Sequence, residues 1–490
     1  MIISLGILSA TLLLALLLGV RGARSAGGTT GGTTSLEQWS VGNRGFGTIL
    51  VFMLLAGEIY TTFTFLGGSG WAYGRGAPAF YIIAYGAVAY IMSYWLLPAI
   101  WQRATAWKVL SQSEYFTRAY GSPALGNLVA VVSIAALMPY LVLQLKGLGI
   151  IVSESSYGAI SANAAIWIGT TATVIYVVLS GVRGSAMTAA LKDAMVLVCV
   201  IGLGLVLPYK LHGGIGPMFA RITAEHPDFL TLPSSGMSPS WFASTVLLTV
   251  LGFYMWPHTF GSVFTARDAS VFRRNAALMP LYQLVLLFVF FIGFAALLSI
   301  PGLQGAEVDL ALLRVTRDTF GPWIVGLVGA AGLLTALVPG SLILMSIATT
   351  LARILRPPRE GQPADSATFA RLLVPLLAGV ALLFTFRGGS TLVTLLLMAY
   401  SMVTQLFPAL LASLFPTARI SAAGAIAGIV VGEAAVAATT LGGVSLATLF
   451  PGWSPRVTDI NAGFLAVILN VGTMVLVSRL PSPTSAPVRA

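Results

Sequence analysis

The chain has 490 residues, of which 57% are apolar and only 8% are charged, and its mean hydropathy is +0.91. A soluble domain carries roughly 25% charged residues, so this composition excludes a water-soluble globule and indicates a chain embedded in lipid. A single cysteine, Cys199, and three histidines exclude a disulfide framework and a histidine-rich metal cluster. The net charge of +11 is explained below by membrane topology rather than by nucleic-acid binding.

Apolar runs long enough to cross a bilayer core of about 30 Å occur thirteen times along the sequence. The first run lacks the basic start and the small-residue cleavage site of a signal peptide, so we expect it to be a helix. The sequence therefore predicts an all-α polytopic membrane protein with about thirteen transmembrane helices. The runs are 2–20, 46–73, 80–101, 124–152, 163–179, 188–207, 240–264, 276–300, 321–351, 369–386, 390–415, 420–441 and 461–480.

The basic residues are distributed unevenly between the two sets of alternate loops. Seventeen Lys and Arg residues fall in one set and seven in the other, and Lys146 and Lys192 lie inside or at the edge of spans. Cytoplasmic loops carry the excess of Lys and Arg. The bias predicts an N-terminus outside the cell and a C-terminus in the cytoplasm.

Two of the predicted spans contain helix-breaking residues, and these spans open successive groups of five. The first of them has threonines followed by glycines, and the second has an aromatic run followed by Pro257-His258. Interrupted helices at corresponding positions of two halves are typical of transporter binding sites, because unwinding frees backbone groups that must face protein, ligand or water. We expect breaks near residues 64–70 and 256–258.

Several segments then resemble one family, the solute:sodium symporters. Residues 36–44 read LEQWSVGNR, residues 65–73 read FLGGSGWAY, residues 114–116 read EYF, residues 144–149 read QLKGLG and residues 184–193 read GSAMTAALKD; Pro257-His258 is followed by Arg273-Arg274. The resemblance covers roughly residues 34–415. The stretch around Trp256 and the segment from Glu58 to Thr61 look most like a bacterial subgroup of monocarboxylate permeases, so we expect the bacterial cytoplasmic (inner) membrane.

The resemblance implies a fold of the leucine-transporter type with two inverted five-helix repeats, one extra helix before them and two after. The expected segments are an N-terminal helix and cytoplasmic linker (1–45), the first repeat (46–207), an extracellular loop (208–239), the second repeat (240–415), and two C-terminal helices with a short tail (416–490).

The expected site residues fall into three groups, drawn from the breaks, from ionisable residues inside spans and from the resemblance. For substrate binding we expect Thr61, Thr62, Thr64, Gly67, Gly68, Gln144, Lys146, Phe253, Tyr254 and Trp256. For ion or proton coupling we expect Ala56, Glu58, Ile59, Lys192, Asp193 and Ser341. For gating and helix breaks we expect Gly70, Pro257, His258 and Pro339.

Each ionisable residue also has a structural interpretation. Glu58 is either a coupling group or a hydrogen-bonded structural carboxyl, and Lys146 pairs either with a substrate carboxylate or with an acidic neighbour such as Glu58. Lys192 is either an interfacial lysine or a coupling group, and it should not pair with Asp193 because adjacent helical residues point about 100° apart. His258 either shuttles protons or caps freed carbonyls, and the aromatic run forms either pocket walls or a helix–helix seam.

These observations predict a secondary transporter rather than an enzyme, since the sequence has no HExxH motif and no phosphate-binding loop. We expect symport of a small organic anion, in particular a short monocarboxylate. We expect no cofactor; the coupling ion is H⁺ or Na⁺. A sodium-coupled carrier of an amino acid or vitamin-like solute, and a membrane-embedded sensor, are the alternatives. The oligomeric state is left open.

The coupling ion is where the chain departs from the family it resembles. The resemblance implies a sodium site between the first and eighth core helices, with adjacent hydroxyls on the eighth. The corresponding region here reads Ala336-Leu337-Val338-Pro339-Gly340-Ser341, which keeps one hydroxyl. A carboxyl group held away from water, such as Glu58, binds a proton more readily. The sequence therefore favours protons over sodium as the coupling ion.

Overall fold

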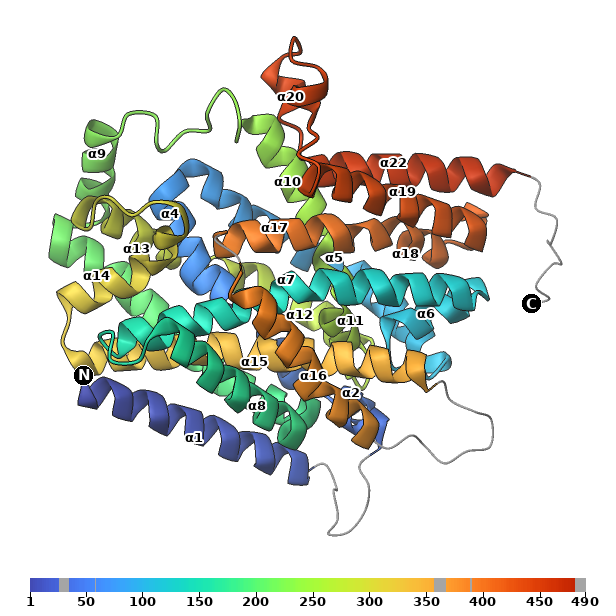
Figure 1. The fold of residues 1–490 in the computed structure, drawn as a ribbon, viewed down its shortest axis with the longest axis horizontal. Helices are drawn as coiled ribbons and strands as arrows, with labels where there is room; N and C mark the ends of the chain where they lie inside the picture. The colour runs from blue at the N-terminus through green and yellow to red at the C-terminus, as the bar shows by residue number, and fades with distance from the viewer. Residues whose placement is uncertain (26–34, 58, 357–366, 388–389, 481–490) are drawn as a thin grey trace.

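The computed structural model describes residues 1–25, 35–57, 59–356, 367–387 and 390–480. Within these ranges the chain is helical, apart from turns and an isolated bridge between Phe46 and Ala266. Ten helices of the described chain are long and apolar enough to cross a membrane. Most of them run along the long axis of the molecule (Figure 1).

The ten long apolar helices, some of them built from two adjoining segments, are α1 (Ile2–Ser25), η3 with α5 (Ala77–Phe80 and Tyr81–Ala106), α7 (Pro123–Ser155), α8 (Ala162–His212), α12 with α13 (Ser270–Gln283 and Leu286–Ser299), α15 (Pro322–Leu355), α16 (Thr368–Thr385), α17 with α18 (Leu392–Val403 and Phe407–Leu414), α19 (Ala422–Thr440) and α22 (Ala462–Arg479). Two shorter apolar helices are α3 (Thr48–Gly57) and α10 (Pro239–Gly252). The remaining short helices are α2 (Leu36–Val41), α4 (Ser69–Arg75), α6 (Gln112–Tyr120), α9 (Ile215–Glu225), α11 (Pro257–Val263), α14 (Ala311–Thr319), α20 (Leu446–Leu449) and α21 (Pro455–Thr458).

Local signals in the sequence account for where many helices begin. The side chains of Ser111, Ser122 and Ser161 accept hydrogen bonds from the first-turn amides of α6, α7 and α8. Such caps satisfy amides that have no partner inside the helix. Proline occupies the first turn of α7 and α15, where its missing N–H costs no hydrogen bond.

The two spans predicted at 163–179 and 188–207 form one long helix, α8, with a kink rather than a loop between them. At 1.5 Å per residue its 51 residues would reach about 75 Å, more than twice the bilayer core. The helix turns at Gly181, where φ is 63° and ψ is −175°. A Cβ at this position would lie 2.8 Å from Cδ1 of Trp39, so the turn requires glycine.

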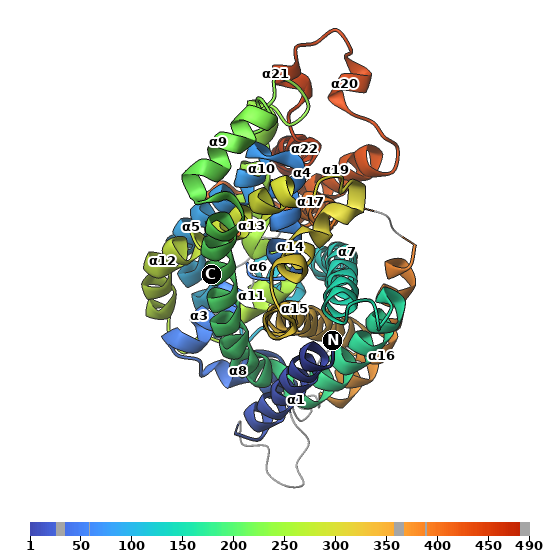
Figure 2. The same cartoon turned by 90° about the vertical axis from the view of Figure 1, so that its left-hand side faces the viewer.

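The helices are arranged around α15, which packs against α1, α7, α8 and α16. The pair α19 and α22 lies on the flank opposite α1, and both views show this separation (Figures 1 and 2). At one end of the bundle lie α9 and α14, and α6 lies at the other (Figure 1). We call these the outer and inner ends, following the predicted charge bias. The expected loop 208–239 contains α9.

Close contact between α8 and α13 gives a direct test of this packing. A Cβ at Gly204 would lie 2.5 Å from Cβ and 2.6 Å from the carbonyl oxygen of Phe288, whereas a Cβ at Gly202 of the same helix would meet nothing within 4 Å. We expect Gly204→Ala to destabilise the protein by about 1–3 kcal/mol through overpacking. Gly202→Ala should be neutral or stabilising, since alanine favours helix. Melting temperatures in detergent compare the two variants, and equal values would contradict the packing.

Candidate functional site

The first interrupted helix consists of α3, a non-helical turn and α4. α3 ends at Gly57, and residues 63–68 form a short π-helix, η2 (Phe63–Gly68), that continues directly into α4. The interruption therefore lies N-terminal to the expected one at 64–70, and Gly67, Gly68 and Gly70 are all helical. Glu58 lies outside the described residues.

The glycines that suggested a break serve close packing instead. A Cβ at Gly70 would lie 2.7 Å from the carbonyl oxygen of Val308, and one at Gly67 would lie 3.0 Å from Cγ2 of Val393. Both neighbours belong to segments distant in sequence. Glycine is needed here because another backbone approaches, a role that glycine often has in membrane helices.

Two of the three expected substrate threonines satisfy the turn itself. The hydroxyl of Thr64 donates to the carbonyl of Ile59, and the hydroxyl of Thr61 accepts from the amide of Phe63. The carbonyl of Ala56 accepts from the amide of Ile59. These hydrogen bonds replace the helical hydrogen bonds that are lost at the interruption. Lipid could not replace them, because it offers no hydrogen-bonding groups.

The third threonine links the interruption to α7. Thr62 Oγ1 donates to Gln144 Oε1 at 2.6 Å, and both residues are buried. The bond assigns the acceptor end of the amide to Thr62, so Gln144 Nε2 is the free donor end, and it has no hydrogen-bond partner in the described structure. Close approach is possible because residue 147 is glycine, whose Cβ would lie 2.6 Å from Cβ of Thr62. A buried N–H donor without a partner costs about 1–3 kcal/mol, which a ligand acceptor would recover.

Lys192 lies fully buried against the same interruption. Its Nζ donates to the carbonyl of Gly57 at 2.7 Å and to the carbonyl of Tyr60 at 3.1 Å. Nζ also lies 3.2 Å from Oδ1 of Asp193, so the expectation that these neighbours do not pair was wrong. The flexible lysine stem bends its ammonium group back toward the carboxylate, although the two Cβ atoms diverge.

The ion-coupling residues predicted from the resemblance are only partly brought together. The carbonyls of Ala56 and Ile59 are bonded within the turn, and those one residue later, at Gly57 and Tyr60, face Lys192. Ser341 Oγ donates to the carbonyl of its own helix at Val338 and lies 3.0 Å from Ser185 Oγ.

The expected gating residue Pro339 lies inside the continuous helix α15. α15 continues through Pro339 without an interruption, and the residues around it are buried against neighbouring helices. Pro339 and Gly340 therefore shape a helix–helix contact, with Gly340 placed against Thr173 and Gln144.

The second interruption lies at the expected place. α10 ends at Gly252, a 3-10 turn (η4, Phe253–Met255) follows, and Trp256 has an extended conformation with ψ of 126° before α11 begins at Pro257. The residue before a proline avoids the helical region, which explains the position. Gln112 Nε2 donates to the freed carbonyl of Met255 at 2.8 Å.

The aromatic residues of this segment form contacts between helices. The Trp256 ring centroid lies 4.9 Å from that of Tyr140 on α7 and 5.0 Å from that of Tyr400 on α17. Phe253 contacts Tyr90 of α5 at 5.4 Å and Tyr254 at 4.9 Å. The aromatic residues of the interruption therefore contact α5, α7 and α17, and Trp256 contacts both α7 and α17.

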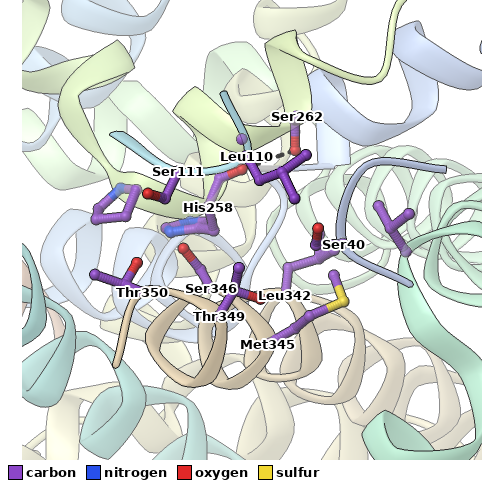
Figure 3. A pocket seen from close by; sticks show the side chains of 13 residues that line it. Ser40, Leu110, Ser111, His258, Ser262, Leu342, Met345, Ser346, Thr349 and Thr350 are labelled. Carbon is purple, nitrogen blue, oxygen red and sulfur yellow. Dashed lines mark hydrogen bonds between the residues drawn. The ribbon is translucent and has the colours of Figure 1, made fainter. Parts of the chain in front are cut away.

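A small polar cavity lies beside the second interruption, at its α11 side (Figure 3). Its volume is ≈ 30 Å³, room for about two waters at ~10–15 Å³ each. Ser346 and Thr349 of α15 point toward His258 (Figure 3). The His258 ring packs 5.5 Å from that of Tyr140, and its carbonyl accepts from Ser262 Oγ at 2.9 Å. The cavity offers hydroxyl groups to water or a polar solute: Ser40, Ser111, Ser262, Ser346, Thr349 and Thr350.

The outer end is covered by a segment that carries a buried carboxylate. Asp309 lies in η5 (Gly305–Leu310), and its Oδ2 accepts from the first-turn amide of α17 at Leu392, 2.9 Å away. Burial raises the pKa of Asp309 to about 7, and the Leu392 amide and the Lys146 ammonium oppose the rise. Lys146 therefore has an acidic neighbour, and that neighbour is Asp309.

Several residues near the interruptions were not predicted from the sequence. Asp309, Gln112, Tyr140 and Tyr400 come from segments far apart in the chain, and each is a common residue type with no motif around it. The signal that was available for Asp309 is that it is acidic and close to a predicted outer end.

Asp309 makes stability depend on pH. An unfolded Asp has a pKa of ~3.9. Between that pH and about 7, the folded protein therefore keeps a proton on Asp309 that the unfolded chain has released. The stabilisation from this group is complete below about pH 4 and is lost as the pH rises through 7. We expect the wild-type melting temperature to fall between pH 5 and pH 8, and the fall to be smaller in Asp309→Asn.

The matched control for this variant is Asp318→Asn, an exposed carboxylate in the same covering segment. It should keep the wild-type pH dependence. An unchanged pH dependence in Asp309→Asn would mean that this carboxyl group is ionised in the folded protein throughout that range.

Comparison with known proteins agrees with this architecture. An uncharacterised symporter of Bacillus subtilis, YhjB, is 56% identical over 477 residues, which span 97% of this chain and 96% of the relative. A monocarboxylate transport permease protein of Rhizobium johnstonii is 27% identical over 479 residues, 93% of this chain and 92% of the relative. Among solved structures, a Na⁺-coupled sialic acid symporter superposes with a TM-score of 0.79 at 17% identity, covering 98% of both chains.

The model of the sodium:solute symporter family matches residues 39–432, which is most of the chain. The relatives named are symporters rather than enzymes, and the structural match shows the fold of the leucine-transporter type. The part of the chain that the structure describes contains ten long apolar helices, so this chain is a multi-pass membrane protein, and it belongs to the sodium:solute symporter family.

Proposed function

We propose that the protein takes up a small organic anion, a short monocarboxylate, by ion-coupled symport. Membership of the family implies a small-molecule substrate and a coupling cation. The observation that supports an anion is the buried Gln144 amide, whose Nε2 has no partner beside the first interruption and whose oxygen is held by Thr62. A carboxylate accepts hydrogen bonds and donates none, so it matches this free donor.

The surroundings of Gln144 favour a compact substrate. Trp256 packs against Tyr140 and Tyr400 near the second interruption, and Tyr140 precedes Gln144 by one turn of α7, so aromatic rings bound this side of the proposed site. Lys146 lies two residues beyond Gln144 on α7 and adds a positive charge toward the outer end. The 27% identical monocarboxylate transport permease protein agrees with this substrate class.

We propose protons as the coupling ion. Sodium is a hard cation that needs several oxygen ligands, and the oxygens near the first interruption are already engaged. The Ser341 hydroxyl bonds to Val338, and the carbonyls of Ala56 and Ile59 bond within the turn. Glu58, which the sequence favours as the proton-carrying group, lies outside the described residues, so this role stays a prediction.

We also propose the full predicted topology. The kink at Gly181 divides α8 into two spans, and the interrupted helices that begin with α3 and α10 add two more to the long helices. An odd number of spans puts the two termini on opposite sides of the membrane, and the charge bias of the loops favours an N-terminus outside and a C-terminus in the cytoplasm of a bacterial cell. α1 begins at the outer end and α22 ends at the inner end, as an odd number of spans requires (Figure 1). The inverted relation of residues 46–207 and 240–415 belongs to the same proposal.

Uptake into vesicles reconstituted with the purified protein tests both substrate and coupling. Labelled acetate, propionate, lactate and pyruvate are compared with proline, a neutral sugar and a vitamin-sized solute, with proton and sodium gradients imposed separately. We expect a proton gradient, acidic outside, to drive accumulation of one or more monocarboxylates. Uptake of a neutral solute alone would exclude the substrate class, and accumulation under sodium alone that survives Glu58→Gln would exclude proton coupling.

Gln144 gives a site-specific test. Gln144→Leu keeps the side-chain size and removes the N–H donor, so we expect KM for the transported anion to rise by about tenfold or more, as losing a hydrogen bond to a charged group costs about 1.5–3 kcal/mol. Lys146→Ala should raise KM as well. Gln304→Leu, at an exposed glutamine of the outer segment, is the control and should leave KM unchanged. An unchanged KM in Gln144→Leu would place the substrate elsewhere.

A further inference from the structure

Lys192 is the most completely buried cation described in this structure, and its environment is that of an ion-binding site. Its exposed fraction is 0%. Three oxygens surround Nζ: the carbonyl of Gly57 at the end of α3 at 2.7 Å, the carbonyl of Tyr60 in the turn that follows at 3.1 Å, and Oδ1 of Asp193 on α8 at 3.2 Å. Two neutral carbonyls and one carboxylate are a set of ligands that also suits a monovalent metal cation.

The position of these oxygens explains why a cation belongs there. α3 ends at Gly57, and the C-terminal carbonyls of a helix carry a partial negative charge. Unwound carbonyls and half-helix C-termini are the groups that coordinate sodium or protons in transporters with broken helices. Without a cation, the two carbonyls and Asp193 would be buried together at a high cost in free energy.

The ammonium group also excludes a second cation from the same place. A Cβ at Gly57 would lie only 3.0 Å from Nζ, which shows how closely the lysine fills the space. Two cations bound to the same oxygens repel each other strongly in a medium of low dielectric constant. A sodium ion can therefore bind to these oxygens only if Lys192 leaves them.

We propose that the Lys192 ammonium is a built-in cation that replaces a sodium ion at the end of α3. The chain thus supplies from its own sequence the positive charge that binds the freed carbonyls of the first interruption. The consequence for transport rests on the proposed function: uptake does not require sodium, because the ammonium group already occupies the position of the ion.

The groups around Lys192 are themselves packed against neighbouring helices. Tyr60 Oη donates to the carbonyl of Tyr282 at 2.9 Å, and the centroids of the two rings lie 4.7 Å apart. α12 therefore packs against Tyr60, whose carbonyl accepts from Lys192. On α15, the Ser341 hydroxyl donates to the carbonyl of Val338 in its own helix. Asp193 is the acidic residue paired with Lys192 among the described residues; Glu58 follows Gly57 and is tested separately below.

Sodium binding to purified protein tests the proposal without any substrate. Wild type should bind no radioactive sodium in a saturable manner. Lys192→Ala leaves the carbonyls and Asp193 in place, so it should gain saturable, stoichiometric sodium binding, and its melting temperature should rise when sodium chloride replaces choline chloride. Where the protein transports a panel anion, sodium should stimulate uptake severalfold in this variant and leave wild type unchanged.

Three further variants make the result specific. Lys210→Ala removes the same charge from the exposed outer end of α8 and should remain unresponsive to sodium. Lys192→Ala combined with Asp193→Asn should lose the acquired binding, because one charged ligand is gone. Glu58→Gln in wild type should not create sodium binding. If Lys192→Ala fails to fold, Lys192→Met, of similar length, takes its place.

Saturable sodium binding to wild type would overturn the proposal, as would a folded Lys192→Ala or Lys192→Met that ignores sodium. These outcomes are independent of the proposed substrate. Failure of every panel anion to be transported, with the sodium-binding pattern intact, would reject the monocarboxylate proposal and leave the built-in cation standing.

Discussion

A helix that is interrupted inside a membrane leaves carbonyl and amide groups that lipid cannot solvate, and the centre of this protein is organised around meeting that requirement. At the first interruption, Thr61 and Thr64 satisfy part of the turn, and the Lys192 ammonium satisfies the carbonyls of Gly57 and Tyr60. At the second, Gln112 bonds the carbonyl of Met255. The interruptions persist because these freed groups find partners either within the turn itself or on another helix.

The residues that supply these partners also connect helices that are far apart in the sequence. Lys192 ties α8 to the end of α3, and Gln144 ties α7 to the residues just after it. Toward the outer end, Asp309 ties the covering segment to α17 and faces the charge of Lys146. Toward the inner end, hydroxyls of α15 and the His258 ring line a small polar cavity (Figure 3). A few polar contacts thus link the two interruptions and the outer segment to the helices around them.

The sequence was informative where a feature depends on local chemistry. Long apolar runs predicted the spans, and Pro257 predicted the second interruption because proline constrains the residue before it. It was less informative where the cause is tertiary. Gly67 and Gly70 looked like a break, yet they are helical, because glycine also permits close packing and only the neighbouring backbone distinguishes the two roles.

The same limit applies to the charged residues. Lys192 was recognised as unusual, but its contact with Gly57 and Tyr60 depends on how α8 crosses α3, which no local pattern encodes. The separation of adjacent Cβ atoms argued against its pairing with Asp193, whereas a long side chain reaches back to a carboxylate when both are buried. Asp309 was missed because an acidic residue in a predicted outer segment is ordinarily exposed, and its burial follows from α4 and α17 packing over it.

The Lys192 ammonium group is proposed to occupy the cation position at the end of α3. An experimental structure determined at high sodium concentration, at a resolution that separates an ion from an ammonium group, would show which of the two is bound there. We expect Nζ of Lys192 within hydrogen-bonding distance of the Gly57 and Tyr60 carbonyls, with no ion density between them. Sodium density bound by those carbonyls, with the lysine side chain turned away, would mean that the ammonium group does not replace the ion.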